Sequence, residues 1–330
     1  GSGGFIDVNH SIIENCYSFG NLEEYDRHII EKGKFLGGFC SINSGDIIDC
    51  FSLGNVNGGE MTGGFVGKSS GNIIRSYSTG SAIGTDTTGG FCGFNSGEIS
   101  ECYSFGDVKG KINTGGFTGM NTGFIENCFT KSFVTSDSLS GGFTGLLDAD
   151  SLNAGIRNSY SANIIDTRIA AGGFVGKIVN NEEGKQLIVN SYWDRQFSGI
   201  DSSAGGRGLP TSLMKQRSTF VNAGWDFDST WSIHPDINGG YPYLQGTPVS
   251  VDEQPVFSEN DELLLYPNPA RDVLYIKFEE AGLKVNIEIY NSLGMKVLNT
   301  KFDKKINISE LSAGIYYLRI GKKSGRFAKR

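Results

Sequence analysis

The chain has few of the residues on which catalysis, metal binding and membrane insertion depend. Only 3 of its 330 residues are histidine and 7 are proline, and no histidine stands in a nucleophile-elbow or metal-ligand pattern. No Cys-x-x-Cys pair occurs, which argues against a zinc site. No run approaches the roughly 18 apolar residues of a membrane-spanning helix. We therefore expect that the chain is not an enzyme and that it has no catalytic residue and binds no metal or cofactor.

Positive charge is also scarce, except near the C-terminus. Residues 271–330 contain 13 Lys and Arg against 6 Asp and Glu, a net charge of +7, whereas the whole chain carries −7. Residues 1–270 therefore carry −14, which argues against a nucleic-acid partner, because phosphates need Lys and Arg neighbours. An acidic body and a basic tail predict two modules with different tasks. The chain begins inside a repeat without a signal peptide, so we expect further sequence before residue 1.

The most regular feature that is present is the phrase Gly-Gly-Phe. It begins at Gly3, Gly37, Gly63, Gly89, Gly115, Gly141 and Gly172. Four of the gaps are 26 residues, and the other two, 34 and 31 residues, are 26 with an insertion. A fixed period of this length indicates stacked copies of one supersecondary unit. The intervening segments are short, β-rich and broken by Gly, Asn and Ser, which predicts an all-β fold. We expect a β-solenoid, similar to a parallel β-helix, with three short strands and three turns in each coil of about 26 residues.

Two columns of the repeat carry its chemistry. Counting the first glycine of each phrase as position 0, position 6 is mostly Asn, which predicts a hydrogen-bonded ladder between coils. Position 12 is polar and must lie outside, so period-2 alternation puts position 13 inside and position 14 outside, unless a bulge reverses them. Position 14 is an aromatic stripe of Tyr17, Phe51, Tyr77, Tyr103, Phe129, Tyr160 and Tyr192. If the stripe faces outward, its rings are candidates to bind surface glycans or proteins; if it faces inward, they are core.

The six cysteines occupy two columns. Cys40 and Cys92 are at position 3, and the other four, Cys16, Cys50, Cys102 and Cys128, are at position 13. One interpretation is a stack of small buried thiols. The alternative is a pair of disulfides, since exported proteins meet an oxidising compartment. The shared ten-residue offset within a coil makes Cys40–Cys50 and Cys92–Cys102 the candidate pairs.

The repeat resembles the GLUG motif. The clearest copy, Gly89 to Val108, reads GGFCGFNSGEISECYSFGDV, and the resemblance covers residues 3–192. The family occurs in bacterial surface proteins, including adhesin-like proteins and some secreted peptidases, in which the repeats are accessory. No catalytic residue belongs to the motif. We therefore assign residues 1–192 to a GLUG-repeat solenoid.

Residues 193–246 break the period and hold all three tryptophans, Trp193, Trp225 and Trp231. A solenoid needs a cap over its last coil, because that coil otherwise exposes a sheet edge and an open core. We interpret this segment as the cap; the alternative is a Trp-rich ligand pocket. Residues 247–262 are acidic and have the composition of a linker.

Residues 263–330 contain six or seven short strands, which predict a small immunoglobulin-like β-sandwich. This tail resembles the type A C-terminal sorting domain of the type IX (Por) secretion system. The resemblance is carried by Tyr266, Pro267, Asn268, Pro269, Asp272, Gly294, Leu311, Gly314, Tyr316, Lys329 and Arg330. It implies that the type IX translocon and its sortase machinery are partners. It also implies export across the outer membrane of a Gram-negative bacterium to the cell surface or beyond.

Together these features predict a secreted, surface-displayed β-solenoid that acts as an adhesin-like binding module or as a stalk. Its expected partners beyond the export machinery are surface glycans or proteins of a host or other cell surface. The alternative is an accessory C-terminal region of a secreted peptidase or glycan hydrolase whose catalytic domain lies before residue 1. A third possibility is that the body is simply cargo for the export tail.

Overall fold

The computed structural model describes residues 1–23, 35–150, 153–167, 169–181, 186–247, 264–266, 270–277, 286–291, 296–301, 305–312, 314–320 and 323–329. The chain forms two compact units, Gly1–Thr247 and Pro248–Arg330. The division falls at the start of the predicted linker, after its first residue, Thr247. Apart from Thr247, the linker lies outside the described residues.

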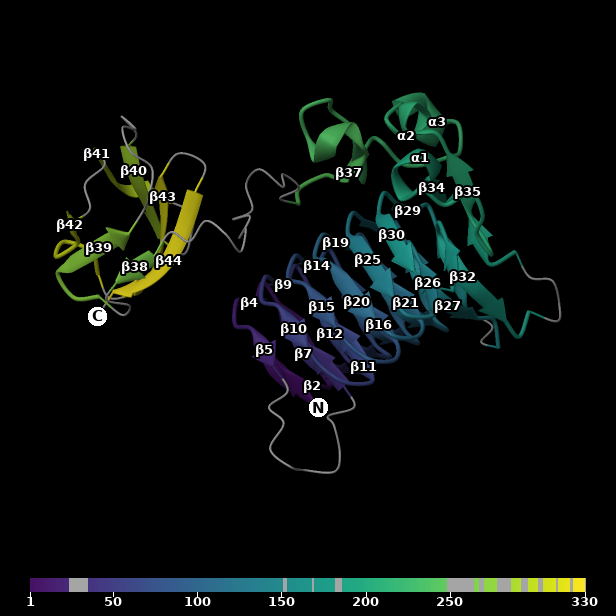
Figure 1. The fold of residues 1–330 in the computed structure, drawn as a ribbon, viewed down its shortest axis with the longest axis horizontal. Helices are drawn as coiled ribbons and strands as arrows, with labels where there is room; N and C mark the ends of the chain where they lie inside the picture. Colours follow the sequence, from purple (N-terminus) through teal and green to yellow (C-terminus); the bar gives the residue numbers. More distant parts are fainter. Residues whose placement is uncertain are drawn as a thin grey trace. The chain divides into compact units, whose positions relative to one another are not determined.

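The first unit is a β-solenoid of stacked coils (Figure 1). A complete coil contributes five short strands, not the three that we expected, because in the 26-residue coils corners of two to four residues divide it. Each strand pairs in parallel with its counterparts in the neighbouring coils, so the described residues of the solenoid form five parallel sheets. We number these sheets first to fifth in the order in which one coil visits them.

The first sheet contains β1 (Ser2–Gly3), β6 (Phe35–Gly37), β11 (Met61–Gly63), β16 (Thr88–Gly89), β21 (Thr114–Gly115), β26 (Leu139–Gly141) and β31 (Ala170–Gly172). The second contains β2 (Ile6–Asn9), β7 (Cys40–Asn43), β12 (Val66–Ser69), β17 (Cys92–Asn95), β22 (Thr118–Asn121), β27 (Thr144–Asp148) and β32 (Val175–Val179). The third contains β3 (Ile12–Glu14), β8 (Asp46–Ile48), β13 (Asn72–Ile74), β18 (Glu98–Ser100), β23 (Phe124–Glu126), β28 (Gly155–Arg157) and β33 (Ile188–Val189).

The fourth sheet contains β4 (Tyr17–Ser18), β9 (Phe51–Ser52), β14 (Tyr77–Ser78), β19 (Tyr103–Ser104), β24 (Phe129–Thr130), β29 (Tyr160–Ser161), β34 (Tyr192–Asp194) and β35 (Arg207–Leu209). The fifth contains β5 (Leu22–Glu23), β10 (Val56–Asn57), β15 (Ala82–Ile83), β20 (Val108–Gly110), β25 (Phe133–Ser136) and β30 (Ile164–Thr167).

The Gly-Gly-Phe phrase forms a corner where two segments of backbone approach closely. A Cβ atom added to Gly89 would lie 2.1 Å from the carbonyl oxygen of Cys92 and 2.7 Å from that of Phe117. Any side chain would therefore force the backbone apart, which explains why this column is glycine in all seven copies. The phenylalanine that follows can then turn into the interior.

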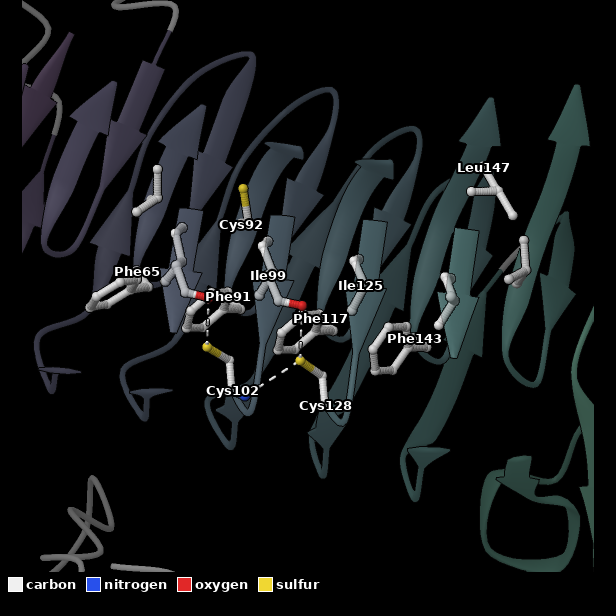
Figure 2. Packing of buried hydrophobic residues seen from close by; sticks show 14 of the residues in the cluster. Phe65, Phe91, Cys92, Ile99, Cys102, Phe117, Ile125, Cys128, Phe143 and Leu147 are labelled. Atoms are coloured by element: carbon white, nitrogen blue, oxygen red, sulfur yellow. Dashed lines mark hydrogen bonds between the residues drawn. The ribbon is translucent and has the colours of Figure 1, made fainter. Parts of the chain in front are cut away.

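The interior is built from ladders of identical residues (Figure 2). Phe39, Phe65, Phe91, Phe117, Phe143 and Phe174 are fully buried, and neighbouring rings stack with centroids 4.8–4.9 Å apart. The expected Asn ladder is also present: Nδ2 of Asn9 donates to Oδ1 of Asn43 at 2.8 Å, and Asn95 donates in the same way to Asn121. These ladders explain the repeat, because each column must match itself in the next coil.

Residues after the last coil close the end of the solenoid and then fold back along its side. β35 adds an eighth strand to the fourth sheet, and Trp193 packs in the interior cluster. The remaining segment contains α1 (Arg195–Ser198), α2 (Thr211–Met214), α3 (Arg217–Val221), β36 (Trp231–Ser232), the 3-10 helix η1 (Asn238–Gly240) and β37 (Tyr243–Leu244). We call residues 193–247 the cap. Within the described residues, no helix is both long enough and apolar enough to cross a membrane.

The second unit consists of two antiparallel sheets in its described part. One has the order β38 (Leu264–Tyr266), β39 (Val273–Lys277), β42 (Lys305–Asn307). The other has the order β41 (Lys296–Lys301), β40 (Asn286–Asn291), β43 (Gly314–Ile320), β44 (Lys323–Lys329). Alternating residues of these strands, among them Leu274, Ile287, Leu318 and Phe327, are buried in a common core. Short alternating strands around one core are the arrangement that the sequence predicts for the tail.

Candidate functional site: an aromatic column, its cap and a sorting domain

The aromatic stripe is a continuous stack of rings that we call the aromatic column. Each of its residues begins one strand of the fourth sheet, and in-register pairing brings the rings together. Centroid separations from Tyr17 through Phe51, Tyr77, Tyr103 and Phe129 to Tyr160 are 4.8–5.2 Å, with planes within 18° of parallel. The strand spacing of a sheet is about 4.8 Å, so the register itself sets this stacking distance.

A turn at position 12 decides which way the column faces. The seven residues there have φ between 46° and 54°: Asn15, Asp49, Arg75, Glu101, Asn127, Asn158 and Asn190. After this left-handed residue, the thiol of Cys102 points into the interior cluster, and the next-but-one residue, Ser104, points inward and donates to the carbonyl oxygen of Gly116. Tyr103, between them, lies on the opposite side. The turn does not reverse the alternation, and the column stands outside the core.

The cap covers the C-terminal part of this column. Trp231 lies 6.1 Å from the ring of Phe129 and 6.2 Å from that of Tyr160, and Trp225 lies 6.1 Å from Tyr192. The indole nitrogen of Trp231 donates to Oδ1 of Asn127 at 3.2 Å. Both indole rings are buried, so they pack structurally against the column and line no open pocket.

The N-terminal part of the column is progressively less covered. Tyr160 and Tyr103 are fully buried, Phe51 and Tyr77 are partly buried, and Tyr17 is 42% exposed. Phe19 meets the edges of Tyr17 and Phe51 at 61° and 77°. The uncovered surface is therefore a row of ring edges, because neighbouring rings of the column occupy each other's faces.

Two charged residues inside the cap interface were missed by the sequence analysis. Asp194 is fully buried and accepts hydrogen bonds from the amide of Phe197, the hydroxyl of Thr211 and the hydroxyl of Tyr241. Lys131 donates from Nζ to the carbonyl oxygen of Asn238 and lies 5.4 Å from the ring of Tyr241. Burial, and then the charge of Lys215, lower the pKa of Lys131 to about 8. No motif marks either residue; their roles depend on contacts between distant segments.

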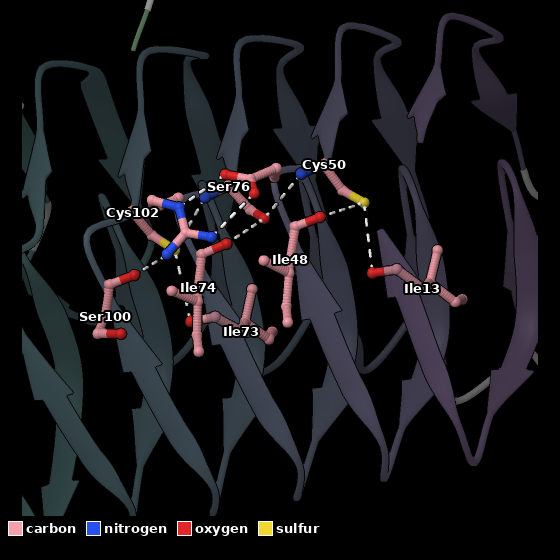
Figure 3. A network of polar contacts seen from close by, with 10 residues as sticks. Ile13, Ile48, Cys50, Ile73, Ile74, Ser76, Ser100 and Cys102 are labelled. Atoms are coloured by element: carbon pink, nitrogen blue, oxygen red, sulfur yellow. Dashed lines mark hydrogen bonds and ion pairs between the residues drawn. The ribbon is translucent and has the colours of Figure 1, made fainter. Parts of the chain in front are cut away.

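The cysteines at position 13 form a ladder with the serines of the same column (Figure 3). The amide of each residue donates to the sulfur or oxygen of the next coil, as from Cys50 to Ser76 at 3.1 Å and from Ser76 to Cys102 at 3.4 Å. Each side chain also donates to the carbonyl oxygen two residues earlier, as Cys102 does to Ser100. Sulfur and oxygen take the same role in this network, which explains why each position of the column is either Cys or Ser.

The candidate disulfides Cys40–Cys50 and Cys92–Cys102, the alternative to buried thiols, are absent, since all six cysteines are free thiols. Cys40 belongs to the second sheet and donates to its own strand at Ile42, whereas Cys50 precedes the fourth sheet and donates to Ile48. A shared ten-residue offset therefore places the two thiols on different walls of the coil. Burial raises the pKa of Cys40 to about 12 and that of Cys50 to about 11.

The residues predicted for the sorting signal are only partly described. Tyr316 is buried, stacks on Phe327 at 5.7 Å and donates from its hydroxyl to the carbonyl oxygen of Ser312. Gly314 begins β43, and among the described residues a Cβ atom added there would meet only the ring of Tyr316, at 3.7 Å. Leu311 packs partly buried against the core, Asp272 accepts the amide of Ile308 through its carbonyl oxygen, and Lys329 ends β44. Pro267, Asn268, Pro269, Gly294 and Arg330 lie outside the described residues, as does the side chain of Tyr266.

A polar cluster lies on the outer face of the second unit. The carboxylate of Glu288 accepts hydrogen bonds from Lys296, Arg319 and the hydroxyl of Tyr290. The Lys296 and Arg319 side chains beside it lower the pKa of Glu288 to about 2. The cluster keeps one positive charge in excess on a largely exposed surface, so we treat it as a solvated feature of the sheet.

Comparison with known proteins assigns the second unit. Part of the chain, covering 28% of it, is 33% identical over 96 residues to a protein of Evansella cellulosilytica described as a Gly-rich membrane protein. The match spans only a tenth of that protein's length. No solved structure matches the chain. Residues 264–330 match the secretion system C-terminal sorting domain, which marks this protein as cargo that the type IX system exports to the cell surface or extracellular space.

Proposed function

We propose that the exported solenoid is a non-catalytic, adhesin-like module that binds a protein of another cell surface through the uncovered part of the aromatic column. The observation that carries this proposal is the continuity of the column. The rings that the cap covers and the rings that it leaves uncovered belong to one stack with one spacing. The uncovered rings therefore offer the same kind of surface to which the chain's own cap already binds.

The geometry favours a protein partner over a glycan. Sugars stack on the open faces of aromatic rings, but in this column the faces of Phe51 are covered by Tyr17 at 5.2 Å and Tyr77 at 5.0 Å. Ring edges instead suit tilted or edge-on aromatic contacts. The cap supplies such contacts, with Trp231 tilted by 53° against Phe129 and Phe220 at 84° to Tyr192. A segment rich in aromatic and aliphatic side chains fits this surface best.

Adherence of the purified full chain to cultured cells tests the proposal. We expect adherence to fall at least tenfold when the cells are treated with protease, and to survive periodate oxidation of their glycans. The double variant Tyr17→Ser with Phe51→Ser should lose adherence. Val8→Ser is the matched control, because Val8 is 41% exposed in the same first coil but lies on the second sheet.

Other outcomes contradict the proposal in distinguishable ways. Loss of adherence after periodate alone would assign a glycan ligand. No adherence of the wild-type chain would favour a stalk, or an accessory region of a secreted peptidase or glycan hydrolase, over an adhesive module. Circular dichroism of the double variant separates lost binding from lost folding.

A further inference from the structure

Four of the six cysteines lie as two neighbouring pairs on the ladder at position 13. Tyr17 pairs with Phe51 and Tyr103 with Phe129 in the fourth sheet, so the residues just before them lie opposite each other in adjacent coils. These preceding residues form the pairs Cys16/Cys50 and Cys102/Cys128. The amide nitrogen of the first member lies 3.3 Å from Sγ of the second in one pair and 3.4 Å in the other. Ser76 occupies the coil between the two pairs.

We propose that each pair closes into a disulfide between adjacent coils, Cys16–Cys50 and Cys102–Cys128, during export, while Cys40 and Cys92 stay thiols. In each reaction two thiols lose two protons and two electrons and one S–S bond forms. The electrons and protons pass to the disulfide of a thiol oxidoreductase in the oxidising compartment that the cargo crosses. That disulfide thereby becomes a dithiol. The proposal rests on export through the sorting domain and is independent of what the aromatic column binds.

The backbone spacing suits such a bond. Adjacent parallel strands are about 4.8 Å apart, which lies within the roughly 4.4–6.8 Å between Cα atoms that disulfides span. The amide of Cys102 donates to Sγ of Cys128 at 3.4 Å, so the second sulfur already lies against the backbone of the first. Cys40 and Cys92 are separated by Val66 in the intervening coil, and two strand spacings exceed the reach of a disulfide.

Closing the second pair leaves the nearest carbonyl acceptor of each thiol with another donor. The Cys102 thiol donates to the carbonyl oxygen of Ser100, but that oxygen also accepts the amide of Arg75 at 3.1 Å. The Cys128 thiol donates to the carbonyl oxygen of Glu126, which also accepts the amide of Glu101 at 3.1 Å. Loss of both S–H groups therefore leaves these two carbonyl oxygens hydrogen-bonded.

Burial decides when the reaction can take place. Cys102 and Cys128 are fully buried, and burial raises the pKa of the Cys128 thiol well above its ordinary value. A folded coil therefore presents almost no thiolate to an oxidant. The Cys102–Cys128 disulfide must therefore form as the coils stack, before the core closes, whereas Cys16 of the other pair is only partly buried.

Counting labelled thiols on the full-length chain tests the proposal. The chain is exported by a bacterium with an active type IX system and is then denatured in excess N-ethylmaleimide. Intact-mass spectrometry then gives the number of labels on each chain. We expect two labels on the exported chain, and six after reduction or when the same chain is made in a reducing cytosol. More than two labels on the exported wild-type chain overturns the proposal.

Two variants identify the pairs. In Cys102→Ser the count should rise to three, with the new label on Cys128, because serine keeps both ladder hydrogen bonds as Ser76 does. In the matched control Cys40→Ser the count should fall to one, on Cys92. A label on Cys50 in Cys40→Ser would assign that cysteine to a partner within its own coil and refute the proposed pairing.

Discussion

Nζ of Lys131 donates a hydrogen bond at 3.1 Å to the carbonyl oxygen of Asn238, which lies 107 residues further along the chain. The contact joins a corner of the solenoid to η1 of the cap. It places an ammonium group in a largely buried interface beside Lys215. The cap therefore binds the column through aromatic contacts and, at one edge, through the Lys131 ammonium group. Burial in the interface disfavours the charge of that group.

The stability of the cap should depend on the protonation of Lys131. Its pKa is lowered from 10.5 to about 8, so the folded chain binds fewer protons than the unfolded chain between these values. Stability therefore rises with pH across this window, and the charge is most costly below pH 8. Relative to Lys131→Met, the wild type should gain roughly 1–2 kcal/mol between pH 7 and 9.5.

Urea unfolding followed by tryptophan fluorescence measures this difference, because all three tryptophans lie in the cap. The Met variant removes the contribution of Lys131 and keeps every other titratable group of the chain. A stability difference that does not change with pH would contradict the prediction.

The indole of Trp231 should carry much of the contact between cap and column. It is fully buried against Phe129, Tyr160 and Trp225. We expect Trp231→Ala to destabilise the cap by about 3–5 kcal/mol, seen as faster hydrogen exchange of cap amides and new exposure of Tyr160. Leu213→Ala is the control, because Leu213 is 38% exposed on α2 and its loss should change stability by less than about 0.5 kcal/mol. Equal effects of the two changes would refute this assignment.

Glycine in the repeated phrase should be required for steric reasons. Gly89→Ala places a methyl group 2.1 Å from a backbone oxygen, whereas the same change at Gly20 meets no described residue within 4 Å. We expect the first variant to lose about 1–3 kcal/mol or more and the second to be neutral or slightly stabilised. Thermal unfolding of the two variants, compared with the wild type, decides between this explanation and a general intolerance of alanine at turns.

The sorting domain offers a way to separate folding from recognition. Tyr316→Ala removes a buried ring and should destabilise the second unit by about 3 kcal/mol, with loss of export. Within the described part of the second unit, Gly314→Ala meets only the ring of Tyr316, at an ordinary contact distance, so the unit should stay folded. If export of Gly314→Ala falls while its circular dichroism is unchanged, the export machinery recognises this glycine directly. Normal export would show that it serves the fold alone.

The repeat could be predicted from sequence because every column matches itself in space. One aligned column of Phe became one stack of rings, and the Asn column became one hydrogen-bonded ladder. Pairings within a coil could not be predicted in this way. Cys40 and Cys50 share an offset in every comparison of the sequence, but only the path of the backbone shows that they lie on different walls.

The cap shows the same limit. Its tryptophans could be identified as structural from their position after the last repeat. However, nothing in residues 193–247 indicates that Trp231 contacts Phe129, a residue of an earlier coil, or that Asp194 meets Tyr241. A repeat alignment also could not predict that Tyr103 is buried while Tyr17, in the same column, is exposed. Identical positions of a repeat acquire different surroundings once a non-repeated segment folds onto some of them.

The confinement of these cap contacts to the last coils has a consequence for how such proteins evolve. Phe129, Tyr160 and Tyr192 meet the cap, whereas the ring contacts described for Tyr17, Phe51 and Tyr77 are with one another, with Tyr103 and with Phe19. Deleting or duplicating one 26-residue unit between Gly37 and Gly115 keeps every ladder in register and does not touch the capped end. The length of the solenoid can therefore change in steps of about 4.8 Å by unequal recombination, while the cap and the sorting domain stay unchanged.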